Sequence, residues 1–342
     1  MAISAFQSAA AYFQVAIGLV SSHTWKADQK FCIDLYSAAA EAEHCSGGFE
    51  QVKLYYSRIM QLVVPPVEKL RICFVMLNIH WVEEQPLDAV KLGTDILSEM
   101  GCHLPRRTTG ILFKTITGLM AAKRYVKILT PEYIDKLPLS TDPVHNGIMR
   151  MLEALVYPCH MAKQEIIPLL CIQMIQRTLK KGVTPLTPYA FGFLGFILAH
   201  FMGDFDGGQL YMKHAFALLK KYDFREVEPR TRFMINAGLV HWVQPWQNMM
   251  HSFVDIYEMG MRAGDCETAT MSIYYYLDAA LYTGRDLESI DEDCDLYMKS
   301  MADFNQQKSH RYAEITLQAV RNLRGKSSNT TKLTGSVMVQ EA

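Results

Sequence analysis

The chain has 342 residues, of which 50% are hydrophobic and 20% are charged. This composition excludes wholesale disorder, because so apolar a chain can bury a large core. The formal net charge is −1 and the isoelectric point is about 6.8, a balance that excludes the basic footprint of a nucleic-acid-binding protein and a polybasic patch for an anionic membrane.

Apolar residues recur with helical spacing in segments of about 15–20 residues, separated by short breaks that hold Gly, Pro or Asp. Strand-type alternation is almost absent, so the sequence predicts an all-α fold. The predicted helices cover residues 4–20, 27–45, 49–62, 65–82, 86–100, 107–123, 143–158, 163–181, 187–202, 206–222, 229–243, 245–263, 265–283, 286–303 and 308–323.

Proline and glycine mark the ends of these predicted helices. Asp142-Pro143 and Thr187-Pro188 are expected to be pairs of an N-cap and a first helical residue, because proline lacks the N–H that a first turn leaves unused. The basic pairs Lys180-Lys181 and Lys220-Lys221 stand at predicted carboxyl ends, where they complement the helix dipole. Six glycines are expected to end helices in left-handed caps: Gly47, Gly101, Gly182, Gly203, Gly264 and Gly284.

Two segments break the helical pattern for longer. Residues 124–142 contain a few strand-like letters and then a turn-rich stretch, which predicts an irregular excursion. Residues 326–342 are rich in Ser and Thr and poor in large apolar residues, which predicts a disordered tail. The predicted organisation is therefore a helical repeat domain over residues 1–325, followed by that tail.

Two apolar segments need to be distinguished from membrane elements. Residues 1–20 lack a positive amino-terminal region and contain Gln7 and Gln14, so they predict a first helix rather than a signal peptide. Residues 189–202 form the most apolar run, but a spanning helix needs about 20 such residues. We interpret this run as a helix buried on all sides.

The eight cysteines are scattered singly, and none forms a Cys-x-x-Cys pair. A zinc ribbon and a thioredoxin-type motif are therefore excluded. Most of these cysteines lie in apolar helical stretches, where a free thiol behaves as a small hydrophobic group. We expect a reducing, cytoplasmic location.

Several segments match the tetratricopeptide pattern, in which small residues let paired helices approach and aromatics fill the seam. The copies are unevenly spaced, which predicts a degenerate solenoid. Their key positions are Ala39, Ala40, Phe49, Val52 and Tyr56 around Gly47; Phe205, Gly208 and Ala215 after Gly203; Cys266 and Ala269 after Gly264; and Ala89 in a weaker copy.

Motifs that carry catalysis or cofactors are missing. The chain has no P-loop, no Gly-x-Gly-x-x-Gly and no His-Glu-x-x-His. Asp204-Phe205-Asp206-Gly207 has a superficial likeness to a kinase motif, but we interpret it as the turn of a helix pair. His44-Cys45 and Cys159-His160 are neighbours whose side chains leave a helix about 100° apart, so they cannot share an ion. We predict a non-enzyme with no catalytic, cofactor-binding or metal-ligating residues and no cofactor.

Three further features allow both a structural and a functional interpretation. The dipeptides His80-Trp81 and His241-Trp242 are interpreted as packed Trp and half-buried His, with ligand stacking as the alternative. The 20 methionines are interpreted as core filling rather than an adaptable surface. A run of carboxylates is interpreted as a solvated helix start, with docking of a basic partner as the alternative: Asp286, Glu288, Asp291, Glu292, Asp293 and Asp295.

Taken in order, the strings LYSAAAEAEHCSGGFEQ, GDFDGGQLYMKHAFALL, HWVQPW and GMRAGDCETATMSIYYY resemble the helical-repeat region of multi-sensor serine/threonine and histidine hybrid kinases with a predicted ATPase module of the STAND type. The resemblance covers roughly residues 31–284. It implies a linker and regulatory scaffold in signal transduction. Because no residue here matches that family's nucleotide-binding, kinase or phospho-acceptor motifs, none of those activities is implied.

The sequence therefore predicts a right-handed α-solenoid of about seven irregular helix pairs. The expected function is protein–protein recognition through the concave surface, with kinase or ATPase chains as possible partners and without nucleic acid or membrane insertion. Three alternatives stay open: a regulatory solenoid that senses a small apolar ligand, an enzyme whose Cys–His site is assembled in space, and a fragment of a multidomain kinase.

Overall fold

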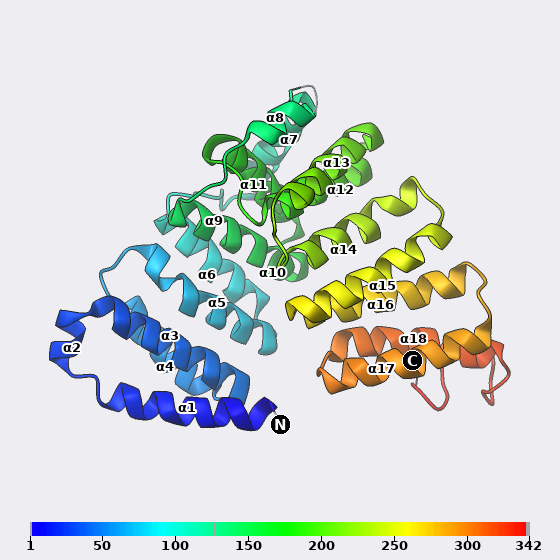
Figure 1. Ribbon diagram of the computed structural model, residues 1–342, viewed down its shortest axis with the longest axis horizontal. Coiled ribbons are helices and arrows are strands. Elements are labelled where there is room, and N and C mark those ends of the chain that lie inside the picture. The colour runs from blue at the N-terminus through cyan, green and yellow to red at the C-terminus, as the bar shows by residue number, and fades with distance from the viewer. Residues whose placement is uncertain (1, 126–127, 340–342) are drawn as a thin grey trace. The chain divides into compact units, whose positions relative to one another are not determined.

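The computed structural model describes residues 2–125 and 128–339. Within these ranges every regular element is a helix, apart from an isolated β-bridge between Leu139 and Val183 (Figure 1). The all-α prediction is therefore confirmed.

The α-helices are α1 (Ala2–Gly18), α2 (Ser22–Ala27), α3 (Gln29–Ser46), α4 (Phe49–Met60), α5 (Pro66–Val82), α6 (Pro86–Glu99), α7 (Thr108–Tyr125), α8 (Pro131–Lys136), α9 (Pro143–Ala154), α10 (Val156–Ala162), α11 (Ile167–Lys181), α12 (Thr187–Met202), α13 (Phe205–Lys221), α14 (Glu228–Gly238), α15 (Trp246–Ala263), α16 (Cys266–Tyr282), α17 (Leu287–Asp303) and α18 (Gln307–Leu323). Two 3₁₀ helices, η1 (Gln164–Ile166) and η2 (Val240–Trp242), lie between them.

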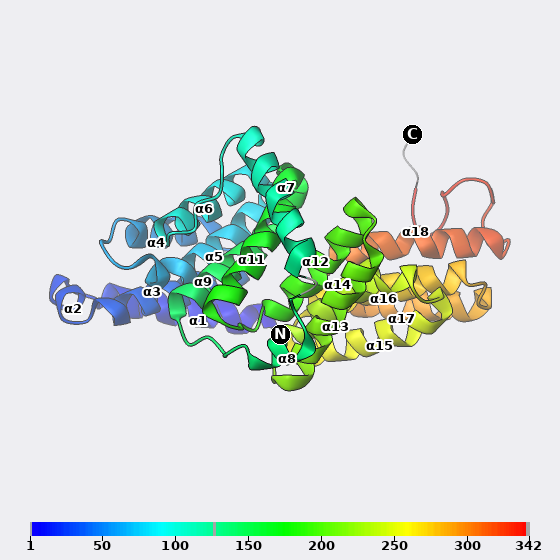
Figure 2. The same cartoon turned by 90° about the horizontal axis from the view of Figure 1, so that it is seen from above.

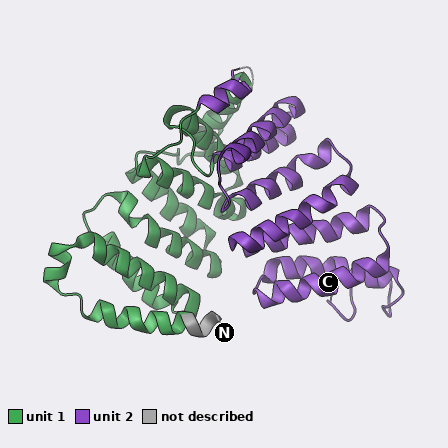
Figure 3. Cartoon of the chain, viewed as in Figure 1, with its two compact units in different colours: residues 1–124, 137–186 green, residues 125–136, 187–342 purple. Residues whose placement is uncertain are grey.

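The chain forms two compact units, residues 1–124 with 137–186, and residues 125–136 with 187–342 (Figure 3). In the first unit, α3 packs on α4 and α5, and α5 packs on α6. In the second unit, α12 packs on α13, α15 on α16, and α16 on α17; Figure 2 shows α15, α16 and α17 running side by side. That residues 1–325 act as a single repeat domain stays a prediction.

The helix pair α3–α4 shows how the small residues around Gly47 are used. Gly47 caps α3 in the left-handed region with φ 87°, and the chain reverses into α4. Ala39, Ala40 and Val52 are fully buried where the two helices meet. The same core holds Tyr36, whose ring lies 5.2 Å from the guanidinium of Arg58.

In the second unit, glycines allow a close approach between the two helices of the pair α12–α13 and between those of the pair α15–α16. A Cβ on Gly195 of α12 would lie 2.7 Å from the carbonyl oxygen of Gly208 in α13. A Cβ on Gly260 of α15 would lie 2.9 Å from Cβ of Ala269 in α16. Because a backbone carbonyl cannot move aside as a side chain can, the α12–α13 crossing depends on both glycines.

Helix α12 has the burial expected for the apolar run at residues 189–202, since most of its residues are buried. Exceptions stand at its carboxyl end, where Phe201 is 73% exposed. Across the described ranges, none of the helices combines the length and the apolar character that crossing a bilayer requires.

Several predicted boundaries are wrong, and prolines explain most of them. The helix predicted over 143–158 ends at Ala154, and a new helix places Pro158 in its first turn, where the missing N–H costs little. The helix predicted from residue 163 starts at Ile167 for the same reason, with Pro168 as its second residue. The helix predicted over 229–243 ends at Gly238 and continues as η2.

Other expectations at helix ends have mixed outcomes. Asp142 is the N-cap of α9, since its side chain accepts from the N–H of Val144, whereas Thr187 is the first residue of α12. All six predicted glycines have positive φ, although Gly182 is extended at ψ 174° rather than left-handed helical. The sequence did not predict α2, nor α8 within residues 124–142.

The bridge at Leu139 joins two segments of the first unit. Ser140 N–H donates to the Val183 carbonyl and Val183 N–H donates to the Pro138 carbonyl, each at 2.8 Å. The buried ring of His145 lies beside them, with Nε2 3.2 Å from the Gly182 carbonyl oxygen. The start of α9 and the end of α11 are thereby held together.

Residues 326–339 contain no helix. They nevertheless contact α18, because Asn322 Nδ2 donates to the Lys332 carbonyl at 2.7 Å and Val337 N–H donates to Gln318 Oε1 at 3.3 Å. Disorder of residues 326–342 stays a prediction.

We predict that Gly195→Ala destabilises the chain by about 1–3 kcal/mol, because the added Cβ overlaps the Gly208 carbonyl oxygen. Urea unfolding followed by circular dichroism measures the change. Gly18→Ala is the matched control, since a Cβ there meets nothing within 4 Å. Equal stability of the two variants would contradict the close-approach argument.

Candidate functional site

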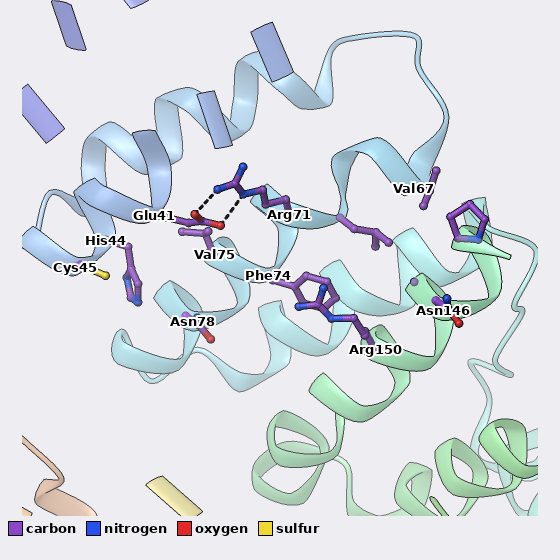
Figure 4. Close-up of a pocket in the computed structure, with 13 residues that line it drawn as sticks. Glu41, His44, Cys45, Val67, Arg71, Phe74, Val75, Asn78, Asn146 and Arg150 are labelled. Carbon is purple, nitrogen blue, oxygen red and sulfur yellow. Dashed lines mark hydrogen bonds and ion pairs between the residues drawn. The ribbon is translucent and has the colours of Figure 1, made fainter. Parts of the chain in front are cut away.

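A groove of about 720 Å³ lies on the first unit between α3, α5 and α9. Figure 4 shows its side chains projecting from these three helices. Its lining is Glu41, His44, Cys45, Val67, Leu70, Arg71, Phe74, Val75, Asn78, Pro143, Asn146, Gly147 and Arg150.

Local sequence fixes the three helices that form this groove. Asp28 caps α3 by accepting from the N–H of Phe31 at 2.9 Å, and Asp142 caps α9. Gly147 sets the spacing of α5 and α9, because a Cβ there would lie 2.4 Å from Leu70 Cδ1. Any larger residue at 147 would force the two helices apart or displace Leu70.

One wall of the groove carries a two-point ion pair. Arg71 Nε donates to Glu41 Oε1 at 2.7 Å, and Arg71 Nη2 donates to Glu41 Oε2 at 2.6 Å. The hydrogen bonds to Glu41 raise the pKa of Arg71. Both side chains are about half exposed, so the pair orients the wall more than it stabilises the fold.

The other wall carries a cation that is not neutralised. The guanidinium of Arg150 lies 4.8 Å from the centre of the Phe74 ring, and Figure 4 shows the two side chains together in the groove. Among the described residues, no hydrogen bond or ion pair engages this guanidinium. A cation on an aromatic face keeps its N–H groups free for an anion.

Two buried polar atoms in the lining lack a hydrogen-bond partner within the described chain, Asn146 Oδ1 and His44 Nδ1. Burial lowers the pKa of His44, so its ring is neutral at pH 7. Since a buried polar atom costs about 1–3 kcal/mol when it is unpaired, each of them favours an occupant that hydrogen-bonds to it.

The groove also contains Cys45, which follows His44 in sequence. Burial and the nearby Glu41 raise the pKa of the Cys45 thiol, which keeps it protonated, whereas a nucleophilic cysteine needs a lowered pKa. In the part of the chain that the structure describes, no three His, Cys, Asp or Glu side chains are grouped to hold a metal.

Both His-Trp dipeptides make side-chain contacts and both histidines are half-buried, but the tryptophans are not packed as interpreted from the sequence, since Trp81 is 42% exposed and Trp242 is 53% exposed. His80 Nδ1 lies 3.2 Å from Gln85 Oε1, and Trp81 meets the ring of Tyr157 edge-on at 4.2 Å. In the second unit, Trp242 Nε1–H donates to His200 at 3.1 Å. The Asp-Phe-Asp-Gly segment is a helix start, since Asp204 accepts from the N–H of Gly207.

Most carboxylates of the run on α17 form ion pairs or hydrogen bonds within the second unit. Asp291 is buried and bonded by Arg321 at 3.0 Å, Lys326 at 2.9 Å and also Arg324. Asp293 pairs with Arg285 at 2.8 Å. Asp291 thereby holds the carboxyl end of α18 against α17, and Asp293 is engaged by the segment between α16 and α17, so the docking of a basic partner is not supported.

Sequence reasoning missed the groove residues. Their signal was present on α5, where a mixed apolar and polar set repeats every three or four residues along one helix face: Val67, Leu70, Arg71, Phe74, Val75 and Asn78. On α9 the same spacing gives Pro143, Asn146, Gly147 and Arg150. A helix face that exposes arginine, asparagine and an aromatic together differs from an ordinary solvated face.

Comparison with known proteins gives no relative: no family model matches the chain, and no curated protein matches it. The resemblance to hybrid-kinase repeats therefore stays an expectation from the sequence.

We predict that Asp291→Asn destabilises the chain by about 2 kcal/mol at pH 7, because three cations lose their shared anion. Burial raises the pKa of Asp291, but hydrogen bonds from Lys326 and Arg321 outweigh it and hold the pKa below its ordinary value. The contribution is therefore full above about pH 4 and is lost as pH falls through the lowered pKa.

Urea unfolding of both proteins from pH 7 downward tests this prediction. The difference between wild type and Asp291→Asn should shrink as the pH falls below 4. Glu292→Gln on the same helix is the control, since no ion pair engages Glu292 in the described structure, and its effect should stay within about 0.5 kcal/mol. A pH-independent difference for Asp291→Asn would refute the electrostatic explanation.

Proposed function

We propose that this chain is a non-catalytic protein-binding module whose groove between α3, α5 and α9 takes an extended segment of a partner protein. The observation that carries the proposal is the composition of the groove. It combines the unpaired cation Arg150, the aromatic face of Phe74 and two polar atoms without partners, Asn146 Oδ1 and His44 Nδ1. A peptide offers a complement to each of them.

In this proposal a backbone N–H of the peptide donates to Asn146 Oδ1, which removes the cost of an unpaired acceptor. A carboxylate of the peptide accepts from Arg150, whose fork of N–H groups suits two carboxylate oxygens. An apolar side chain of the peptide packs against Phe74 and Val67. The preferred partner segment is therefore acidic, with an apolar residue close to the acid.

The wider architecture that we propose is a tetratricopeptide-like, right-handed solenoid. In its favour, α3–α4 and α15–α16 are helix pairs that turn at left-handed glycines, with small buried residues where the helices meet. On that architecture α3 and α5 are first helices of successive pairs, which places the groove on the concave surface.

The signalling role is the part of the proposal that rests on the sequence resemblance. We propose a scaffold that acts with large multidomain kinases or ATPases in the cytoplasm. The eight cysteines, all free thiols in the structure, agree with a reducing compartment.

The second candidate is a sensor of a small apolar molecule. The groove volume of about 720 Å³ favours it, because small-molecule sites occupy about 300–1,000 Å³. The exposed Arg71, Asn78 and Arg150 along its length fit a peptide better than an apolar ligand.

We predict that Arg150→Glu abolishes the binding of partner proteins to the groove. Affinity capture from native cell extract with quantitative mass spectrometry compares wild type, Arg150→Glu and the control Arg107→Glu, an exposed arginine outside the groove. Proteins bound through the groove should fall about tenfold or more with Arg150→Glu, because reversing an interfacial charge costs about 2–5 kcal/mol. The control should retain them.

A thermal-shift screen with nucleotides and small apolar molecules on the same proteins separates the two candidates. No shift, together with partners that depend on Arg150, supports the protein-binding function. The opposite result is a ligand-induced shift in melting temperature that Arg150→Glu abolishes, with the same proteins captured by wild type and variant. It would favour the small-molecule sensor over the protein-binding function.

A further inference from the structure

The second unit holds an aromatic cluster that the groove does not involve. It consists of rings from α12, α13, η2, α15 and α16 in successive contact: Phe196, His200, Phe205, His241, Trp242, Trp246 and Tyr282. Trp242 is 53% exposed and Tyr282 is 72% exposed, so the cluster forms part of the surface. Two imidazoles lie within it, with ring centres 6.2 Å apart.

The hydrogen bonds of His200 define its protonation. Its Nδ1 lies 3.2 Å from the carbonyl oxygen of Phe196, and a carbonyl only accepts, so Nδ1 carries the proton. Its Nε2 lies 3.1 Å from Nε1 of Trp242, and an indole only donates, so Nε2 presents a lone pair. This arrangement requires a neutral His200.

A proton on His200 Nε2 is incompatible with this contact. The imidazolium would present N–H groups on both sides, and one of them would meet the indole N–H at a distance that suits only a donor and an acceptor. The indole would then lose its partner. Trp242 is more than half exposed, so its side chain can rotate into water without a cavity being left in the core.

Titratable groups lie on the elements that carry the aromatic cluster. They include His241 on η2, Asp204 and Asp206 at the start of α13, His251 on α15 and Tyr282 on α16. Asp204 is engaged by the N–H of Gly207. Burial first, and His200 second, lower the pKa of His241.

We propose that the His200–Trp242 hydrogen bond is a pH-sensitive latch on this aromatic surface. Near neutral pH the indole is held against His200 and Phe205. At mildly acidic pH, protonation of His200 Nε2 releases the indole, which then no longer packs against the Phe205 ring.

The indole N–H resonances of ¹⁵N-labelled full-length chain test the latch between pH 8 and pH 5. The chain has four tryptophans, and Trp242→Phe identifies the resonance of Trp242. We expect this resonance to shift as the pH falls, because protonation of His200 removes the acceptor of the indole N–H. Trp25 and Trp81, which lie in the first unit, should stay unchanged.

Two variants assign the proton. His200→Gln keeps an acceptor for the indole but does not titrate, so the shift of Trp242 should be lost. His241→Gln should retain it. Direct titration of the His200 ring in the wild type gives a readout that does not depend on the folding of a variant, and its midpoint should coincide with that of Trp242.

Four outcomes would overturn the latch. They are a Trp242 resonance that stays flat, a shift that persists in His200→Gln, a shift that vanishes in His241→Gln, and a joint movement of all four indoles. The last would show that acid unfolds the chain rather than releasing one side chain.

Discussion

The close approach of helix backbones is the constraint on which the other features depend. Where α12 crosses α13, Gly195 leaves no room for a side chain beside the Gly208 carbonyl, and Gly147 does the same between α5 and α9. Backbones at this distance bury helix surfaces continuously. The spacing of α5 and α9 in turn defines the width of the groove that holds Phe74 and Arg150.

The sequence predicts the helices well because the helical spacing of apolar residues and the Gly, Pro and Asp residues at helix ends agree over long segments. Left-handed glycines, the Asp142 cap and the buried run at 189–202 follow from local chemistry alone. Errors arise where a proline lies inside an apolar run, as at Pro158, since the pattern continues although the helix restarts. The short helices α2 and α8 carry too little periodicity to be recognised.

The candidate site could not be predicted in the same way. Arg150 and Phe74 are far apart in sequence, and either residue alone resembles an ordinary exposed or half-buried position. Only the packing of α5 on α9 shows that the guanidinium lies on the ring and that Asn146 Oδ1 is left without a partner. The acidic run on α17 illustrates the converse. Its pattern is conspicuous in the sequence, but Asp291 forms ion pairs with Arg321 and Lys326, which are distant in sequence.

The bridge between Leu139 and Val183 has a topological consequence. The hydrogen bonds of Ser140 and Val183 close the intervening segment into a loop. This segment contains α9, α10 and α11, and its two ends are joined at the bridge. Once the loop is closed, further ordering within it costs less chain entropy. The three helices should therefore open together, as one cooperative block of the first unit, and α9 would bring its wall of the groove into that block.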